Sequence, residues 1–326
     1  MKLASLKRGG RDGSLIVVSR DLSTAVAANT IAPTLRDAIE NWPAVEPALR
    51  ELAAKLEAGD AVHAFALDPA TLAAPLPRTF QWADGSAYLH HAELVRKARN
   101  ADMPSLLYEE PLLYQGASDS FIGARDDILL PREEWGLDLE AEIAVVTGDV
   151  PLGCTPAEAA GHIRLVMLLN DVSLRNLMPS ELSKGFGFFV SKPSTAFAPV
   201  AVTPDELGDA WDGTKLSLPV ASHVNGKLLG RPNAGVDMYF DFSRLIAFAA
   251  TSRELRAGTI IGSGTVSNRD HSAGSSCLQE KRMLEQIEHG AITTPFLRAG
   301  DTVHIDVTDA SGQSVFGAID QRVVAP

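Results

Sequence analysis

The 326-residue sequence predicts an α+β fold that is predominantly β. Strand-like runs and turns fill most of the chain after residue 75, and apolar residues recur at helical spacing there in only three stretches. The regular strand and helix alternation of a doubly wound parallel sheet is missing. We therefore expect a small N-terminal α/β domain at residues 1–75, joined through a proline-rich connector to a larger mixed domain at residues 76–326.

The N-terminal part begins with two alternating runs, residues 14–19 and 24–27, which are typical of a short β-hairpin. Apolar side chains at helical spacing follow in residues 34–57. Pro43 and Pro47 interrupt this pattern, and proline disfavours a helix interior. We therefore expect two helices in this segment.

Beyond the connector, the pattern predicts three helices, at residues 86–100, at 155–169 and at 240–253. The pair Asn225-Gly226 predicts a type I′ hairpin turn, because both central positions of that turn need positive φ.

A four-residue sequence, Leu-Arg-Ala-Gly, occurs at residues 255–258 and again at 297–300. Each copy precedes a β-rich run, residues 259–266 and 302–307 respectively. We expect two similar units in which a turn leads into a strand, although the echo is too short to establish a repeat.

The composition limits the classes of function. A formal net charge of −12 argues against nucleic acid or an anionic membrane as a partner, since these are held by clustered Lys and Arg. Cys154 and Cys277 are too few for a disulfide framework or a cysteine zinc site. The N-terminal residues lack a signal-peptide core, and no run of about 18 apolar residues occurs. We expect a cytoplasmic protein.

Glu140 and Glu142 form the first candidate site. If this segment is a strand, both side chains point to one face, with their origins roughly 6 to 7 Å apart. An acidic, solvated strand face is the ordinary explanation of such a pair. However, residues 144–146 are apolar on both faces, which indicates a covered strand, where two like charges are costly without a cation.

Two further carboxylates could join this pair. Asp171 ends the buried-looking run at residues 165–171, although it could simply form a turn. Asp84 precedes a predicted helix, where it could equally be an N-cap. Oxygen ligands without a cysteine pair suit Mg²⁺, Mn²⁺ or Ca²⁺ better than structural zinc.

His91 lies seven residues after Asp84, about two helical turns away and on the same side, which makes it a candidate general base. His90 points about 100° away from it. Arg96 and Arg99 follow on the same predicted helix and could bind a substrate carboxylate, but basic residues near a helix C-terminus need no such role.

Taken together, these residues resemble the fumarylacetoacetate hydrolase family in order and approximate spacing, over roughly residues 75–326. The matching segments are Asp84 with His91, Tyr114-Gln-Gly-Ala-Ser118, Glu140-Ala-Glu142, Asn170-Asp-Val-Ser173, Lys192 and Ser263-Gly-Thr-Val-Ser267. The smaller N-terminal part looks like the variable domain that precedes this family's core. The resemblance implies a mixed β-sandwich roll and a homodimer or larger assembly.

The resemblance also implies a divalent metal, with Mg²⁺ expected first and Mn²⁺ or Ca²⁺ as alternatives. Its ligands would be Asp84, Glu140, Glu142 and Asp171. In fumarylacetoacetase-like members the histidine that matches His91 activates water.

Further roles follow from the same resemblance. Lys192 would hold the substrate and its developing charge, Tyr114 would contact the substrate, and Thr265 would line the pocket.

The sequence departs from the family pattern at several positions. The carboxylate that partners the histidine falls near Gln279, with Glu280 one residue later, so the base has two candidate partners. The tyrosine between Asp84 and His91 is Tyr88, and Met178 stands where the family has a contacting glutamine after the Asn-Asp motif. The substrate can therefore differ from fumarylacetoacetate.

The expected activity is hydrolysis of a carbon–carbon bond in fumarylacetoacetate or a related acylpyruvate-type diketo acid, as in tyrosine or other aromatic catabolism. One alternative is a decarboxylase, hydratase or tautomerase of the same family acting on 2-oxo acids. A second alternative is a non-catalytic protein that binds a metal or ligand.

Overall fold

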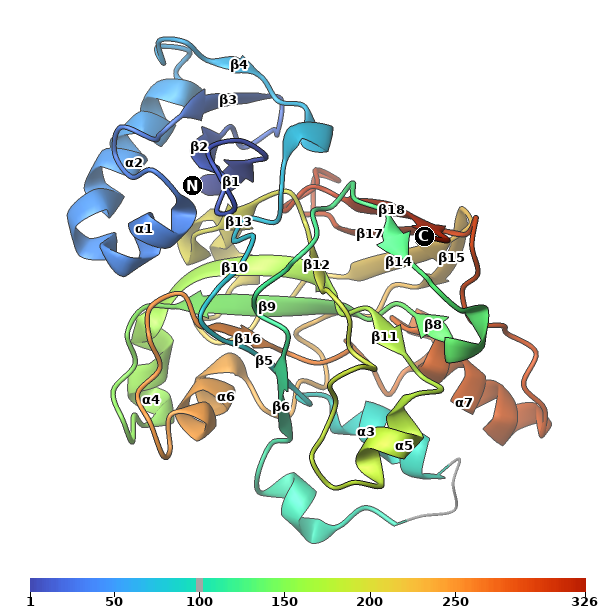
Figure 1. Cartoon of the computed structure of the whole chain (residues 1–326). Helices are drawn as coiled ribbons and strands as arrows, with labels where there is room; N and C mark the ends of the chain where they lie inside the picture. Colours follow the sequence, from blue (N-terminus) through green and yellow to red (C-terminus); the bar gives the residue numbers. More distant parts are fainter. Residues whose placement is uncertain (98–101) are drawn as a thin grey trace.

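The computed structural model describes residues 1–97 and 102–326, with Val95 and Arg96 described in their backbone only. One long sheet runs through the molecule (Figure 1). Its strands, in spatial order, are β4 (Phe65–Ala66), β3 (Thr24–Ala27), β2 (Ser14–Val18), β1 (Lys2–Leu6), β13 (Ala201–Val202), β10 (Ile163–Asn170), β9 (Ala141–Thr147), β16 (Ile260–Gly262), β5 (Trp82–Gly85) and β6 (Leu113–Gly116), while β12 (Ala196–Phe197) also pairs with β10.

Two smaller sheets accompany the long one. The five-stranded sheet has the order β15 (Lys227–Gly230), β14 (Val220–Val224), β17 (Thr302–Val307), β18 (Ile319–Val324) and β7 (Ile128–Leu129). A short ladder pairs β8 (Leu137–Asp138) with β11 (Ser173–Leu174). Together with the long sheet they give the predicted mixed, predominantly β core.

The helices lie outside the sheets (Figure 1). They are α1 (Leu35–Glu40), α2 (Trp42–Glu57), α3 (Leu89–Lys97), α4 (Pro156–Ala159), α5 (Met178–Leu182), α6 (Phe242–Ala249) and α7 (Leu278–His289). Helices α1 and α2 cover the N-terminal strands, whereas α3, α5 and α7 lie at the opposite end of the molecule. No helix in the described part of the chain is long and apolar enough to cross a membrane.

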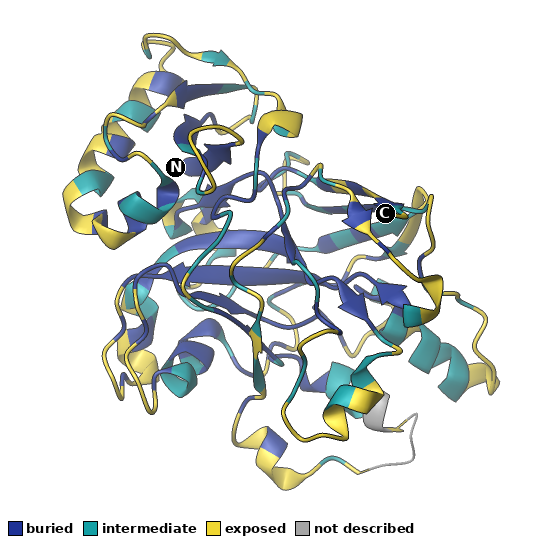
Figure 2. Ribbon diagram, in the orientation of Figure 1, coloured by how far each residue is buried: buried dark blue, intermediate teal, exposed yellow. Residues whose placement is uncertain are grey.

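Strands β9 and β10 form the centre of the core and are almost fully buried (Figure 2). Along β9, Ile143 and Val145 pack into one hydrophobic cluster, and Ala144 and Val146 pack into another on the opposite face. The prediction that this strand is covered on both sides is therefore confirmed, and a polar side chain on it has no access to bulk water.

The N-terminal strands continue the long sheet. Strand β1 pairs with β13, with Lys2 opposite Val202 and Leu3 opposite Ala201. Both hydrophobic clusters also extend into the N-terminal strands, through Leu3 on one face and Ala4 on the other. The segment before residue 75 thus shares its sheet and its core with the rest of the chain.

Two predicted hairpins are confirmed. Strands β2 and β3 pair antiparallel, as do β14 and β15. At the second turn, Asn225 has φ 52° and Gly226 has φ 72°, so both central residues occupy the left-handed region that a type I′ turn requires.

The two Leu-Arg-Ala-Gly segments do form similar local structures. Leu255 and Leu297 each make an isolated β-bridge, and Gly258 and Gly300 have φ values of 90° and 97°. Each glycine lies just before a strand, β16 or β17.

The helix predicted at residues 155–169 is wrong in most of its length. Helix α4 ends at Ala159, a short 3₁₀ turn follows, and β10 begins at Ile163. The run from Ile163 onward is apolar at nearly every position, and such a pattern cannot distinguish a buried helix from a strand covered on both faces.

The break predicted between the first two helices is also misplaced. It lies at Asn41, while Pro43 stands in the first turn of α2 and Pro47 lies inside the helix. Proline is tolerated in a first turn because the N–H groups there have no partner within the helix.

Candidate metal and catalytic site

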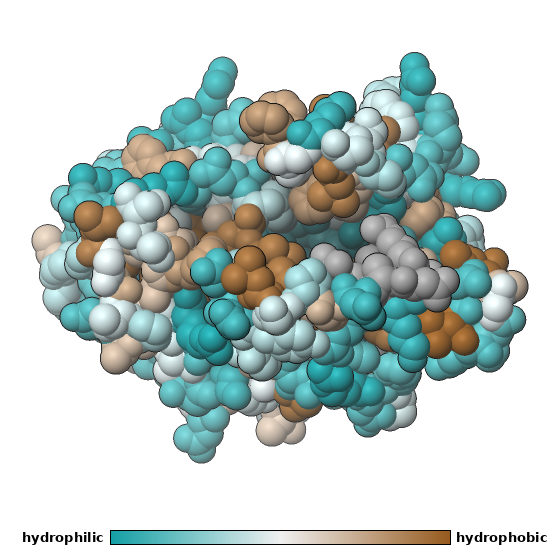
Figure 3. All heavy atoms as spheres, turned by 90° about the horizontal axis from the view of Figure 1, so that it is seen from below, coloured by the Kyte–Doolittle hydropathy of each residue, from teal (hydrophilic) through white to brown (hydrophobic). Residues whose placement is uncertain are grey.

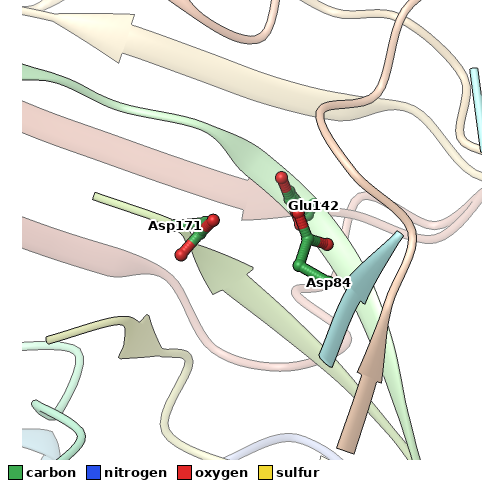
Figure 4. A group of neighbouring side chains, drawn as sticks. All are labelled: Asp84, Glu142 and Asp171. Atoms are coloured by element: carbon green, nitrogen blue, oxygen red, sulfur yellow. The ribbon is translucent and has the colours of Figure 1, made fainter. Parts of the chain in front are cut away.

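Three buried carboxylates from three strands meet in the interior: Asp84 on β5, Glu142 on β9 and Asp171 directly after β10 (Figure 4). One oxygen from each lies within 4.8 Å of the others. Strand β16 lies between β5 and β9, and its Gly262 pairs with Asp84. A Cβ on Gly262 would lie 2.4 Å from the Asp84 Oδ1 atom, so the group requires glycine there.

Glu142 is the most demanding member of this group. It is fully buried, and neither of its oxygens has a hydrogen-bond partner among the described residues. Burial and the nearby carboxylates of Asp84 and Asp171 raise its pKa well above the ordinary value. The pKa of Asp84 is raised to about 8, chiefly by burial and then by Asp171.

These residues fit a divalent cation. A cation placed among the three carboxylates would supply the missing partner of Glu142 and offset the repulsion between like charges. All of the ligand atoms are carboxylate oxygens, which Mg²⁺, Mn²⁺ and Ca²⁺ prefer.

Glu140 lies beside this group and has different partners. It precedes β9, so the two glutamates do not share a regular strand as predicted. Arg175 donates from Nη2 to one oxygen at 2.6 Å, and Lys192 donates to the other at 2.5 Å. Burial opposes ionisation of Glu140, but Arg175 and Lys192 outweigh it and hold the pKa of Glu140 below its usual range.

Lys192 connects Glu140 to the carboxylate group. It is buried, although its place in a turn-like segment would ordinarily predict exposure, and its ammonium also donates to Asp171 Oδ2 at 2.5 Å. Desolvation alone would lower the pKa of Lys192, but Asp171 and Glu140 raise it above the usual value. The lysine is therefore a fixed positive charge inside the site.

Tyr114 and Thr195 complete the surroundings of Asp171. The Tyr114 hydroxyl donates to Oδ2 at 2.5 Å, and the Thr195 hydroxyl donates to Oδ1 at 2.9 Å. Burial, followed by the charges of Asp171 and Asp84, raises the pKa of Tyr114 well above its ordinary value, so the phenol stays protonated. Phe188 stands edge-on to the Tyr114 ring, with 5.4 Å between the ring centroids.

His91 on α3 faces Glu280 on α7. Its Nδ1 lies 2.8 Å from Glu280 Oε2, and the glutamate side chain is only 2% exposed. The two candidate partners of His91 are thus distinguished, since the contact is made by Glu280 and not by Gln279. His90, the neighbouring residue, faces His271 instead.

The remaining predicted residues lie in different settings. Thr265 is buried and follows Gly264, whose backbone N–H donates to Asp84 Oδ1 at 3.0 Å. Arg99 and the side chain of Arg96 lie outside the described residues. The face that carries α3 and α5 is hollowed near its centre, with hydrophobic side chains along part of the rim (Figure 3).

Sequence reasoning missed two charged residues of the site, Arg175 and Asp138. Arg175 is the buried cation between Glu140 and Asp138, and Asp138 is itself fully buried. One signal for a second cation was available in the sequence, which predicts more interior carboxylates than Lys192 alone can compensate. Buried acids require a compensating positive charge.

The fold and the site define a class of proteins that combine an interior group of carboxylates with a histidine–glutamate pair between helices α3 and α7. Residues 81–324 match the model of the fumarylacetoacetate (FAA) hydrolase C-terminal domain, and residues 1–78 match fumarylacetoacetase N-terminal domain 2. The chain belongs to the fumarylacetoacetate hydrolase family, whose members include hydrolases, isomerases and tautomerases.

Two curated relatives carry different activities in their names. The 2,4-didehydro-3-deoxy-L-rhamnonate hydrolase of Sphingomonas sp. is 30% identical over 159 residues, which is 48% of this chain and 53% of that protein. A human mitochondrial oxaloacetate tautomerase is 27% identical over 184 residues, 56% of this chain and 54% of the relative. The matches thus span about half the length of each relative.

Solved structures show the same fold over the whole chain. The putative HpcE protein of Mycobacterium smegmatis has a TM-score of 0.70 at 21% identity, covering 100% of this chain and 99% of that one. Maleylpyruvate hydrolase from Sphingobium sp. SYK-6, in complex with manganese (II) ion and pyruvate, has a TM-score of 0.67 at 17% identity with the same coverage.

Proposed function

We propose that this protein is a metal-dependent hydrolase that cleaves a carbon–carbon bond in fumarylacetoacetate or a related acylpyruvate-type diketo acid. The observation that carries the proposal is the presence of two features in one site: the His91–Glu280 pair, with His91 near enough for its charge to help lower the pKa of Glu140, and the buried carboxylates of Asp84, Glu142 and Asp171. This combination offers both a general base and a place for a chelated substrate.

Asp84, Glu142 and Asp171 would hold the cation, with Glu140 as a fourth ligand if it exchanges Lys192 for the metal. When bound, a divalent cation polarises a carbonyl oxygen and fixes a chelating 2-oxo acid. The related maleylpyruvate hydrolase with manganese and pyruvate supports a cation and a pyruvate-type product. We propose Mg²⁺ as the native ion, with Mn²⁺ as a substitute.

His91 is the proposed base. When the Nδ1–H group donates a hydrogen bond to Glu280, the Nε2 atom carries no proton and is free to accept one. His91 removes a proton from water as the water oxygen attacks the acyl carbonyl. The carbon–carbon bond then breaks, its electron pair moves into the departing enolate of the oxo acid, and the proton held by His91 can complete that product.

Lys192 and Tyr114 act on the developing charge. The Lys192 ammonium is buried inside the site, where it contacts Asp171 and Glu140, and exchange of Glu140 to the metal would free it to stabilise an oxyanion. Phe188 against Tyr114 favours an acyl substituent with apolar character at this side of the pocket. We also propose that the protein works as a homodimer, which light scattering would test.

A tautomerase acting on a 2-oxo acid is the second candidate, favoured by the oxaloacetate tautomerase among the relatives. The same His91 could remove a proton from the carbon next to the carbonyl and return it elsewhere, without attack by water. The two reactions differ in their products, because hydrolysis yields two molecules and tautomerisation yields one.

The test is a panel of diketo acids, including fumarylacetoacetate and acylpyruvates with apolar acyl groups, each assayed with Mg²⁺ or Mn²⁺. Loss of the enol absorbance reports turnover, and NMR identifies the products. Formation of two carboxylic acid products that depends on the metal supports the hydrolase. Exchange of a carbon-bound proton for deuterium, without cleavage, supports the tautomerase and contradicts our first proposal.

A further inference from the structure

One buried carboxylate outside the proposed ligand set, Asp138, touches both halves of the site. Its side chain is 0% exposed and lies on β8, which pairs with β11. Within the described part of the chain, three groups donate to it: the backbone N–H of Leu278 at 2.7 Å, the backbone N–H of Gln279 at 2.9 Å, and Arg175 Nε at 2.9 Å.

The first two contacts fix the beginning of α7. Leu278 and Gln279 are the first residues of this helix, and Glu280 is the third. A negative charge that accepts from the first N–H groups of a helix satisfies unpaired donors and interacts favourably with the helix dipole. Because Glu280 occupies the same turn, Asp138 sets the position from which Glu280 reaches His91.

The third contact, with Arg175, connects Asp138 to the carboxylates of the site. Arg175 bridges from Asp138 to Glu140, Lys192 bridges from Glu140 to Asp171, and each of these contacts is buried or nearly so. Charges of alternating sign therefore connect Asp138 to a proposed metal ligand. Moving Arg175 would take one of its two cationic partners from Glu140 and leave it with Lys192, in a low-dielectric interior where such a loss is costly.

We propose that Asp138 is a positioning residue that couples the general base to the metal carboxylates, by fixing the N-terminus of α7 and the Arg175 side chain at the same time. This inference rests on the proposed function, which assigns His91 as the general base and the carboxylates as metal ligands. A residue that only capped a helix would influence the Glu280–His91 contact and leave the carboxylates unaffected.

The test uses Asp138→Asn in the full-length protein, which keeps the shape of the side chain but replaces one acceptor oxygen by a donor that faces N–H groups. Two measurements need no substrate: the affinity for Mn²⁺ by titration calorimetry, and the ¹⁵N NMR shifts of His91, with Glu280→Gln as the reference for a broken contact. They remain informative even if no diketo acid is turned over.

We expect the variant to bind Mn²⁺ about 10- to 100-fold more weakly, as is typical when a residue supporting the ligands is lost. The His91 signals should move towards those of Glu280→Gln. With an active substrate, kcat should fall about 100-fold while KM changes much less.

Asp149→Asn is the matched control. Asp149 also accepts from a backbone N–H, that of Ala257 at 3.1 Å, and lies 4.0 Å from an arginine, but it stands beyond the opposite end of β9. We expect it to change none of these values more than twofold.

Wild-type Mn²⁺ affinity and wild-type His91 shifts in folded Asp138→Asn would overturn the proposal, even if its melting temperature falls. A change in the Mn²⁺ affinity alone, or in the His91 shifts alone, would also contradict the coupling. If the variant does not fold, Arg175→Lys replaces it, since lysine cannot bond Asp138 and Glu140 as a guanidinium does. Unchanged His91 shifts in that variant would then contradict the coupling.

Discussion

At the scale of single residues, Glu142 places a carboxylate in the interior where the described residues offer it no hydrogen bond. Asp84 and Asp171 bring further negative charge towards it, whereas Glu140 is compensated by Arg175 and Lys192. The carboxylates therefore differ in their compensation: Glu140 has two cationic partners, Asp171 shares Lys192 with it, and the group of Asp84, Glu142 and Asp171 carries more negative charge than that one lysine offsets, so that a cation would stabilise it.

Glu142→Gln should abolish the stabilisation of the protein by a metal ion. The wild type should gain about 2.7 kcal/mol of unfolding free energy when Mn²⁺ is present at a hundredfold excess over its dissociation constant, and a chelator should remove this gain. Thermal unfolding with and without Mn²⁺ measures it. Glu206→Gln removes another buried glutamate, one that pairs with the N-terminus, and should keep the response. An undiminished response in Glu142→Gln would contradict its role as a ligand.

His91→Ala should lower kcat by about 10² to 10⁴, the usual contribution of a general base, while Mn²⁺ affinity stays within a few-fold of wild type. Glu280→Gln should lower kcat less, because the imidazole remains but loses the carboxylate that orients it. Steady-state kinetics and calorimetry provide the values. His289→Ala, an exposed histidine at the end of the same helix α7, serves as the control. Normal turnover in His91→Ala would remove this residue from the mechanism.

At the scale of secondary-structure elements, α7 is fixed at both ends by carboxylates. Asp138 accepts from its first residues, and Glu285 in the last half of the helix accepts from the backbone of Thr293 and Thr294 and from the Thr294 hydroxyl. Burial opposes ionisation, but these hydrogen bonds hold the pKa of Glu285 at about 2. The helix and the following segment are thereby held together.

Glu285→Gln should therefore destabilise the protein in a pH-dependent way. The folded-state pKa is below the unfolded value, so the stabilisation is present above about pH 4.5 and is lost as the pH falls towards 2. We expect a difference in unfolding free energy of about 1 kcal/mol at pH 7, after allowing for partial exposure, that shrinks below pH 4. Urea unfolding at several pH values measures it. Glu288→Gln, on the same helix, is the control; a difference independent of pH would contradict the assignment.

At the scale of the whole molecule, the N-terminal segment and the rest of the chain share one sheet. Strand β1 supplies the neighbour of β13, and Leu3 belongs to a hydrophobic cluster that also holds Val146 and Leu165. Both central strands of the site, β9 and β10, thus depend on a core to which the first residues contribute.

Deletion of residues 1–75 should consequently leave residues 76–326 aggregated or loosely packed. The deletion would expose the edge of β13 and a large apolar area, and both favour aggregation. Light scattering and near-UV circular dichroism measure the outcome, and co-expression of residues 1–75 as a separate chain should restore solubility. A soluble, well-packed 76–326 fragment with wild-type Mn²⁺ affinity would show that the shared core is dispensable.

The sequence alone determined which residue types could do chemistry and several local structures. The Asn225-Gly226 turn, the turns before β16 and β17, and the covered strand at Glu142 follow from local preferences. Local sequence also made Asp84, His91 and Asp171 candidates for the site. These features depend on neighbours along the chain, so a pattern can reveal them.

Only the tertiary structure decided the pairings. It placed Glu280 and not Gln279 against His91, gave Glu140 to Arg175 and Lys192, and made residues 163–170 a strand. Each outcome depends on charge compensation or burial among segments far apart in the chain, and a local pattern contains no information on those neighbours.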